Sequence, residues 1–279
     1  FDFLGITLQY EMCYTNILQV LDLSGIPLRT KDRKKGDTLV IGGGPCSYNP
    51  EPIADFFDIF YMGEGEVSYD ELLELYKVYK HSDMTRQEFL IKVSNIPGLY
   101  VPELYEVTYH EDGTIASFGP KFDGVPATVT KTVVMDHSKV TYPEKPVVSF
   151  MKLTQDRVVL EIMRGCIRGC RFCQAGMIYR PTRPKNVDML KGYAEKMLAS
   201  TGHEEITFSS LSSSDYEDLP ELTDCLIEKM DNEHVNISLP SLRIDAFSLD
   251  VMSKIQDVKK SSLTFAPEAG TQRLRNVIN

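Results

Sequence analysis

Residues 164–185 read RGCIRGCRFCQAGMIYRPTRPK and contain three cysteines, Cys166, Cys170 and Cys173, with the spacing C-x3-C-x2-C. A short apolar run, residues 158–163, comes directly before them and predicts a buried strand. In α/β folds, the loops at the carboxyl ends of the strands carry the chemistry. The sequence therefore predicts a functional loop at the end of a buried strand.

The spacing of the cysteines limits the metal that they can bind. Thiolate ligands select zinc, copper(I) or iron–sulfur clusters, and a structural zinc site takes four ligands, usually in paired knuckles. A fourth ligand is missing here, because the next cysteine is Cys225, in a predicted helix, and no histidine lies between Glu161 and Gly202. The three cysteines therefore fit a four-iron cluster with one iron left open for a small molecule. A zinc knuckle and three unrelated core cysteines remain as alternatives.

The same stretch is rich in basic residues although the chain has a net charge of −10. Six basic residues and no acidic one lie within it: Arg164, Arg168, Arg171, Arg180, Arg183 and Lys185. An electron-rich cluster and a ligand with a carboxylate both prefer cationic neighbours. Gly165 and Gly169 allow the backbone to fold tightly around an inorganic core. We therefore interpret the basic residues as neighbours of the cluster and its ligand.

These motifs also resemble a known family. The cysteine spacing, with Phe172 directly before the third cysteine, resembles the radical S-adenosylmethionine (radical SAM) superfamily. The longer string EIMRGCIRGCRFCQAGMIYRP, residues 161–181, is similar to a branch with an N-terminal cobalamin-binding-like domain. The resemblance covers nearly the whole chain. It implies a [4Fe-4S] cluster on the three cysteines, S-adenosylmethionine (SAM) as a cofactor, and Phe172 beside that cofactor.

Length and composition restrict the class of protein further. The 279 residues suffice for one large or two ordinary domains, and 42% hydrophobic with 25% charged residues is typical of soluble globular proteins. The negative net charge argues against general binding along nucleic acid, but it leaves a local RNA site open. No apolar run approaches the about 18 residues of a membrane helix, and no signal peptide is recognised. Clustered cysteines of this kind indicate a reducing, cytoplasmic location and no membrane partner.

The first domain is predicted over residues 1–93. Apolar strands alternate with helices there, which implies a doubly wound parallel sheet of Rossmann type. Two strands end in glycine loops, GGGP at 42–45 and GEGE at 63–66, and these strings are similar to cobalamin-binding-like domains. The cobalt-binding motif D-x-H-x-x-G is not visible, so no visible residue supports cobalamin. We favour a scaffold in which the glycines make turns, and Cys13 and Cys46 read as packed small residues.

A connector is predicted over residues 94–156. It contains a hairpin joined through residues 111–113, and its two histidines, His110 and His137, read as solvated. Residues 157–279 then alternate strands, predicted at 157–163, 205–209, 235–239 and 262–266, with helices, predicted at about 185–200, 217–231 and 248–256 and from near Gly270. A closed barrel of eight such units needs about 250 residues, so the resemblance implies the first half of a partial (β/α)6 radical SAM barrel.

The predicted fold class is therefore α/β, with a truncated Rossmann-like, cobalamin-binding-like domain before the half barrel. The chain starts within a predicted strand and ends within a predicted helix. We accordingly expect it to be a piece of a longer protein.

The loop after the second strand of the half barrel is rich in serine. It reads SSLSSSD, residues 209–215, and the resemblance gives it the place of the motif that binds the methionine amino group of SAM. It departs from the usual G-G-E pattern. Ser209, Ser210 and Ser212 are the candidate ligands, because hydroxyl and carbonyl oxygens accept from an ammonium group. The alternative is a loop that only caps the next helix.

Two further candidates follow the third and fourth strands. Arg243 is a candidate clamp for the SAM carboxylate, since a guanidinium binds a carboxylate with two hydrogen bonds, and the alternative is an ordinary surface arginine. Glu268 resembles the acidic residue that relatives place near the SAM ribose or amino group. Its alternative is a glutamate in the first turn of a helix, favoured by the helix dipole.

The predicted activity is that of a radical SAM enzyme. One electron, from a donor of the flavodoxin or ferredoxin type, splits SAM into methionine and a 5′-deoxyadenosyl radical that abstracts hydrogen from a substrate. The sequence does not specify the substrate. One alternative is a methylthiotransferase or cobalamin-assisted methyltransferase acting on RNA or protein. The other is a non-catalytic zinc or iron–sulfur interaction module.

Overall fold

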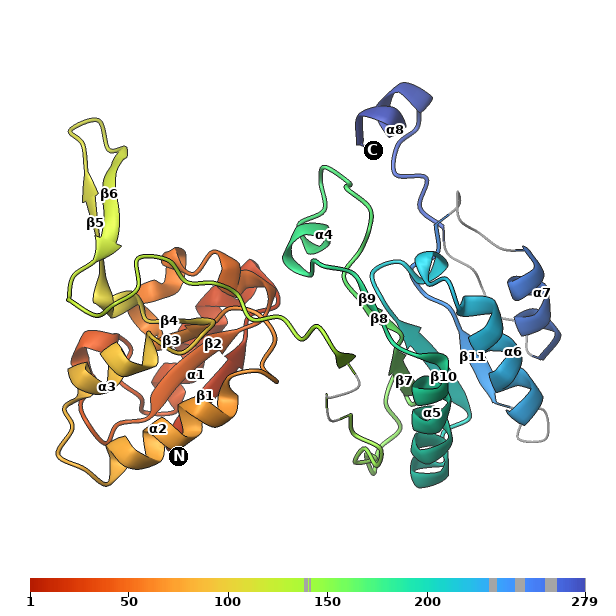
Figure 1. Cartoon of the computed structure of the whole chain (residues 1–279), viewed down its shortest axis with the longest axis horizontal. Coiled ribbons are helices and arrows are strands. Elements are labelled where there is room, and N and C mark those ends of the chain that lie inside the picture. Colours follow the sequence, from red (N-terminus) through yellow and green to blue (C-terminus); the bar gives the residue numbers. More distant parts are fainter. Residues whose placement is uncertain (138–139, 141, 231–234, 244–248, 259–264, 279) are drawn as a thin grey trace. The chain divides into compact units, whose positions relative to one another are not determined.

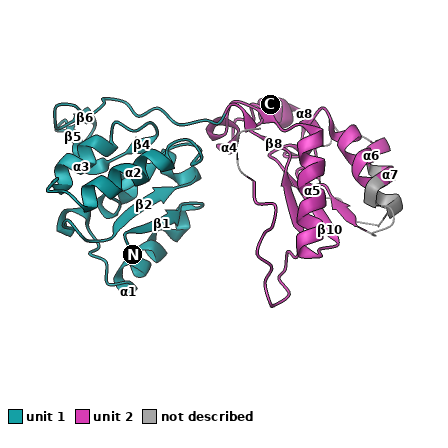
Figure 2. Cartoon of the chain, turned by 60° about the horizontal axis from the view of Figure 1, so that its bottom comes forward, with its two compact units in different colours: residues 1–134 teal, residues 135–279 magenta. Residues whose placement is uncertain are grey.

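The computed structural model describes residues 1–137, 140, 142–230, 235–243, 249–258 and 265–278. The chain divides into two compact units, residues 1–134 and 135–279 (Figure 2). The predicted connector, residues 94–156, is thus divided between them. Among the described residues, no helix combines the length and the apolar character needed to cross a membrane.

Unit 1 is built on a four-stranded sheet in the order β1-β2-β3-β4 (Figure 1). The strands β1 (Phe3–Thr7), β2 (Leu39–Gly43) and β3 (Ile59–Tyr61) are parallel, whereas β4 (Leu99–Tyr100) is antiparallel to β3. The parallel strands predicted for residues 1–93 are confirmed in β1, β2 and β3, and the antiparallel β4 belongs to the predicted connector. A pair of helices, rather than a single one, connects β3 to β4, so the chain returns to the carboxyl end of β3 and enters β4 in the opposite direction.

The remaining elements of unit 1 are helices, short 3-10 turns and a hairpin. The helical elements are η1 (Glu11–Cys13), α1 (Tyr14–Leu23), η2 (Thr30–Asp32), η3 (Pro45–Tyr48), η4 (Glu51–Phe56), α2 (Tyr69–Lys80), α3 (Arg86–Val93) and η5 (Pro102–Leu104). Helix α3 begins at a capping box, in which Thr85 Oγ1 accepts from the Glu88 backbone N–H and the Glu88 carboxylate accepts from the Thr85 backbone N–H. The predicted hairpin is confirmed as β5 (Tyr105–Tyr109) and β6 (Ile115–Pro120).

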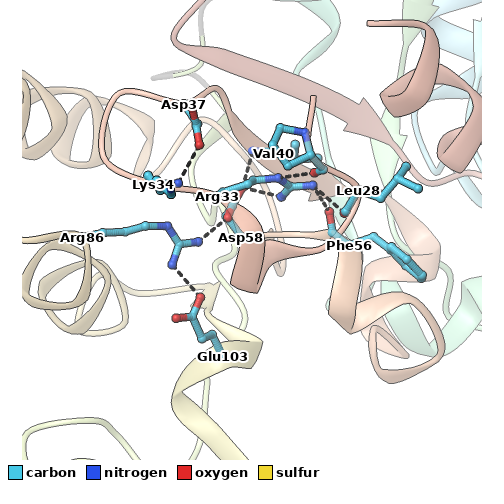
Figure 3. Close-up of polar contacts among 10 residues, drawn as sticks. Leu28, Arg33, Lys34, Asp37, Val40, Phe56, Asp58, Arg86 and Glu103 are labelled. Atoms are coloured by element: carbon cyan, nitrogen blue, oxygen red, sulfur yellow. Dashed lines mark hydrogen bonds and ion pairs between the residues drawn. The ribbon is translucent and has the colours of Figure 1, made fainter. Parts of the chain in front are cut away.

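A buried ion-pair network stabilises unit 1 beneath its sheet (Figure 3). Asp58 is 1% exposed and accepts hydrogen bonds from Arg33 Nη1 and the Val40 backbone N–H, each at 2.7 Å. Arg86 also pairs with Asp58 and continues to Glu103 at 2.6 Å. Because a buried carboxylate is costly unless it is paired, this network joins β2, α3 and η5 around one charge.

Unit 2 contains a parallel sheet in the order β11-β10-β7. Its strands are β7 (Val158–Glu161), β10 (Glu205–Ser209) and β11 (Asn236–Ser238), joined by α5 (Val187–Thr201) and α6 (Leu219–Met230). This alternation confirms the predicted strands and helices between 157 and 239. Helix α5 begins where Asn186 accepts from the Asp188 backbone N–H and ends at Gly202, which has a φ of +71°.

The rest of unit 2 consists of short elements and two further helices. They are β8 (Met163–Arg164), α4 (Ala175–Ile178), β9 (Arg183–Pro184), η7 (Ser213–Asp215), α7 (Leu249–Val258) and α8 (Gln272–Ile278). The predicted strand at 262–266 falls largely outside the described residues. The described chain is therefore α/β, with a mixed four-stranded sheet, a parallel three-stranded sheet and two antiparallel two-stranded pairs.

Candidate cluster and cofactor site

The three cysteines lie on a loop, residues 165–182, that leaves and rejoins the sheet of unit 2 beside β7. We call this segment the cysteine loop. The antiparallel pair β8–β9 closes its base. Gly165 has a φ of +84°, and an added Cβ would lie 2.6 Å from the Pro181 carbonyl oxygen and 2.7 Å from that of Tyr179. Only glycine fits this position, because the returning strand of the loop occupies the space of a side chain.

The thiols of Cys166, Cys170 and Cys173 are all half-buried, and none is in a disulfide. The Arg168 backbone N–H lies 3.4 Å from Cys166 Sγ as a donor. Within the described ranges, no three histidine, cysteine, aspartate or glutamate side chains are arranged to share a single metal ion. Three thiols on one short loop form a soft donor set, which suits an iron–sulfur cluster or zinc.

The basic residues around the cysteine loop have a different role from the predicted one. Glu161 accepts from Arg164 Nε at 2.8 Å and from Lys185 Nζ at 2.6 Å. Burial tends to raise the pKa of Glu161, but these two hydrogen bonds outweigh it and hold the pKa below its usual value. Arg168 binds Asp215 with two hydrogen bonds. Three of the six basic residues therefore neutralise carboxylates of the chain itself.

A cavity of about 780 Å³ opens beside the cysteine loop. Its lining includes Cys170, Arg243 and Glu268, together with Gln272 and Arg275 from α8. Arg243 Nη1 lies 4.0 Å from Cys170 Sγ. Glu268 is exposed and has a φ of +63°. The structure thus brings together one predicted metal ligand and two predicted SAM contacts from three separate loops.

The other predicted contacts lie outside the lining of this cavity. Ser209 ends β10, Ser210 Oγ lies 2.9 Å from Ser213 Oγ, and Ser212 is 2% exposed. Phe172 is on the cysteine loop and is 60% exposed. The serine loop reaches the site through Ser214, whose hydroxyl accepts from the Arg243 backbone N–H at 3.1 Å.

Several contacts around the site could not be predicted from the sequence. The Arg168–Asp215 pair joins positions 47 residues apart, and Arg275 belongs to a helix that the pattern predicts only as a start near Gly270. His137, predicted to be solvated, is 6% exposed, so that prediction is wrong. Burial, and then the neighbouring Arg164, lowers the pKa of His137. The residues next to His137 in the sequence are polar, which predicted exposure, but residues distant in the chain bury it.

The glycine loops of unit 1 are filled by the chain itself. Gly44 has a φ of +95°, and an added Cβ would lie 3.1 Å from the Leu8 carbonyl oxygen. Gly63 has a φ of +116°, and its Cβ would lie 2.2 Å from the carbonyl oxygen of Thr132, which bridges to it. These close backbone contacts agree with the interpretation that Gly44 and Gly63 make turns. His81 comes after α2 and His110 after β5, so neither histidine of unit 1 belongs to the loops directly after β1, β2 or β3.

Two family models match the chain. "Radical SAM proteins, N-terminal" matches residues 1–102, and "Radical SAM superfamily" matches residues 160–279. The cysteine spacing and both matches together show that the chain belongs to the radical SAM superfamily. The uncharacterized protein MJ0966 of Methanocaldococcus jannaschii is 32% identical over 281 residues, which cover 100% of this chain and 52% of that protein. The chain therefore spans about half the length of this relative.

Two solved structures resemble the fold across both units. One is the cobalamin-dependent S-adenosylmethionine radical enzyme OxsB with aqua-cobalamin and S-adenosylmethionine bound (TM-score 0.54, 12% identity, covering 99% of this chain and 37% of that one). The other is the radical S-adenosylmethionine methyltransferase TsrM from Kitasatospora setae with its tryptophan substrate and a SAM analogue bound (TM-score 0.52, 14% identity, covering 98% and 49%). At these identities the likeness concerns the fold alone.

Proposed function

We propose that this chain is the cluster- and SAM-binding part of a radical SAM enzyme. Cys166, Cys170 and Cys173 would hold a [4Fe-4S] cluster, and SAM would occupy the adjoining cavity. One observation supports this most strongly: Cys170, Arg243 and Glu268, from three different loops, line one cavity at the carboxyl ends of the strands of unit 2. Superfamily membership supports the same conclusion.

The residues of the cavity bind and orient in this proposal. When bound, the cluster supplies the electron that divides SAM into methionine and a 5′-deoxyadenosyl radical. Arg243 binds the SAM carboxylate with its guanidinium, and Glu268 accepts from the amino group or a ribose hydroxyl. Leu242, Ala266, Pro267 and Ile278 form the apolar part of the cavity lining. The electron comes from a flavodoxin or ferredoxin type of donor, and the substrate stays unassigned.

The proposal includes a finer description of the fold. We assign β7, β10 and β11 as the first strands of a partial (β/α)6 barrel. Unit 1 is assigned as a Rossmann-like domain of the cobalamin-binding-like kind, of which a part is seen here. The parallel order of β7, β10 and β11 in chain sequence supports the first assignment, and the parallel strands β1 to β3 support the second.

A cobalamin-assisted methyltransferase is the second candidate. It is favoured by the fold likeness to OxsB and TsrM, which extends over both units. Against it, backbone atoms of Leu8 and Thr132 occupy the space in front of Gly44 and Gly63 in unit 1. Absorbance titration of the whole protein with aqua-cobalamin tests this candidate, and saturable, stoichiometric binding would favour it over the first.

The central experiment replaces the three cysteines one at a time with alanine. After anaerobic reconstitution with iron and sulfide, we expect each variant to lose the cluster and to stop releasing 5′-deoxyadenosine from SAM under a chemical reductant. Cys225→Ala is the matched control, because Cys225 is also half-buried in unit 2 but belongs to α6. Stoichiometric zinc without iron in the wild type would instead favour a non-catalytic metal module.

A further inference from the structure

The cysteine loop is held mainly by polar contacts and hardly by apolar packing. Its large apolar side chains point to solvent: Ile167 is 64% exposed, Phe172 60% and Met177 61%. Ile178 is buried, but it lies near the end of the loop. A loop with so little apolar burial has a low local stability unless directional contacts restrain it. The contacts that restrain this one are therefore candidates for a functional role.

The strongest of these contacts joins Arg168 to Asp215. Arg168 lies between the first two cysteines, and its Nε donates to Asp215 Oδ2 at 2.9 Å while Nη2 donates to Oδ1. The side chain of Asp215 is 5% exposed, and that of Arg168 is 31% exposed. The two-fold hydrogen bond fixes both the position and the orientation of the guanidinium plane. Hydrogen bonds from Arg168 also lower the pKa of Asp215.

The residues next to Asp215 also connect to the cavity. Ser214, next to Asp215, accepts from the Arg243 backbone N–H, and the Arg243 side chain reaches Cys170 Sγ. The Arg171 backbone N–H donates to the Ile278 carbonyl oxygen at 3.0 Å. Asp215 thus lies where the cysteine loop, the serine loop and the loop of Arg243 meet.

We propose that Asp215 is a positioning residue, which holds the cysteine loop through Arg168 in the conformation that accepts a cluster. This inference rests on the proposed function of the three cysteines. Before iron binds, no metal–sulfur bonds hold the three cysteines together, so the conformation of the loop depends on the contacts of the chain itself. A bidentate pair with a buried carboxylate restrains one geometry, which is how a metal site is organised before its metal binds.

The test measures the loop in the metal-free protein as well as cluster loading. Hydrogen exchange of the whole chain, read by mass spectrometry, reports residues 165–182 directly. In Asp215→Asn we expect these amides to exchange about tenfold faster and iron incorporation to slow by a similar factor. Asp224→Asn is the matched control, since Asp224 pairs with Lys254 on the surface of the same unit, with both side chains about half exposed.

Two further variants keep the test decisive. Arg168→Lys retains the charge but loses the two-fold hydrogen bond, so it should loosen the loop less than Asp215→Asn does. The double variant Arg168→Asp with Asp215→Arg swaps the two charges and can form the ion pair again. Its hydrogen-exchange rates and iron uptake should therefore return toward those of the wild type, whereas no such recovery is expected if Asp215 is needed only for general folding. Exchange in Asp215→Asn equal to that in Asp224→Asn would overturn the inference. If the wild type binds no iron at all, the proposed function fails, while the exchange measurement still decides the role of Asp215.

Discussion

The carboxyl ends of the strands in unit 1 are covered by the chain itself, whereas a cavity lies at those of unit 2. In unit 1, Leu8 and Thr132 fill the space in front of Gly44 and Gly63 with backbone atoms. In unit 2, half-buried thiols and a cavity of about 780 Å³ lie at the equivalent edge of the sheet. Glycine allows the chain to pack closely against itself in both units, because the nearest atoms to Gly165 belong to the cysteine loop. The two units differ in the loops after their strands, and the proposed cluster and SAM site belongs to unit 2.

The two units also differ in how they use buried charge. Asp58 in unit 1 is enclosed by two arginines and stabilises the packing of the sheet. Asp215 in unit 2 is similarly enclosed but binds a residue located between two cysteines. An ion pair with a buried aspartate thus lies in the core of unit 1 and, in unit 2, beside the proposed cluster ligands.

The largest effect is expected at Asp58. Asp58→Asn leaves two guanidinium groups without a buried counter-ion, so unit 1 should lose about 3–5 kcal/mol in its free energy of unfolding. The chain contains no tryptophan, so hydrogen exchange in increasing urea is the suitable measurement. The exchange of residues 157–209 in unit 2 should not change. Asp55→Asn, which breaks the exposed pair with Arg29, should cost less than about 1 kcal/mol; equal losses would contradict the comparison.

A pair of glycine substitutions separates packing from chemistry. Gly63→Ala and Gly165→Ala both place a Cβ within 3 Å of backbone atoms at a positive φ, and each should cost about 2–4 kcal/mol locally. Gly63→Ala should loosen unit 1 and leave iron uptake intact, whereas Gly165→Ala should impair iron uptake. Gly192→Ala, in α5 with open space around it, should be neutral or stabilising by about 1 kcal/mol. Loss of iron in Gly63→Ala would remove the distinction between the units.

A moderate effect is expected at the cavity. Arg243→Ala should weaken SAM binding about tenfold to a hundredfold, because a charge-assisted pair with the carboxylate contributes about 1.5–3 kcal/mol. Equilibrium dialysis with the reconstituted protein measures this directly. Arg29→Ala, at an exposed arginine in unit 1, should leave the affinity unchanged. Unchanged affinity in Arg243→Ala would exclude this residue as the carboxylate clamp.

The smallest effect is a pH dependence that arises at His137. Burial lowers the pKa of His137 from its ordinary value of 6.5, so the unfolded chain takes up the proton first. The stability contributed by the neutral ring is therefore present above that value and decreases as the pH falls. The charged groups around it are Arg164, Lys185, Glu161 and Arg183.

Hydrogen exchange at several pH values between about 5 and 7.5 measures this dependence. His137→Gln should reduce the loss of stability of unit 2 on acidification, while His81→Gln, at an exposed histidine after α2, should not. An unchanged pH profile in His137→Gln would show that other groups cause the dependence.

The local parts of the fold follow from local patterns. Short apolar runs predict β1, β2, β3, β7, β10 and β11, and the turn signal at residues 111–113 predicts the hairpin. These predictions succeed because periodicity and turn chemistry act over a few neighbouring residues. The direction of β4 could not be predicted in this way, because it depends on how α2 and α3 pair in space. No local pattern contains that information.

The cysteine spacing alone is enough to indicate the ligand class, since it places three soft donors within one short loop. The residues around them acquire their roles through contacts across the sheet. Arg168 and Lys185 read as neighbours of an anionic cofactor, yet they bind Asp215 and Glu161, and His137 is buried among cations. The type and spacing of side chains determine which metals they can bind. Ion pairing and burial depend on segments that are distant in the sequence and meet only in the folded chain. For this reason the sequence predicts which side chains would bind a metal, whereas only the packing shows which carboxylates the basic residues pair with.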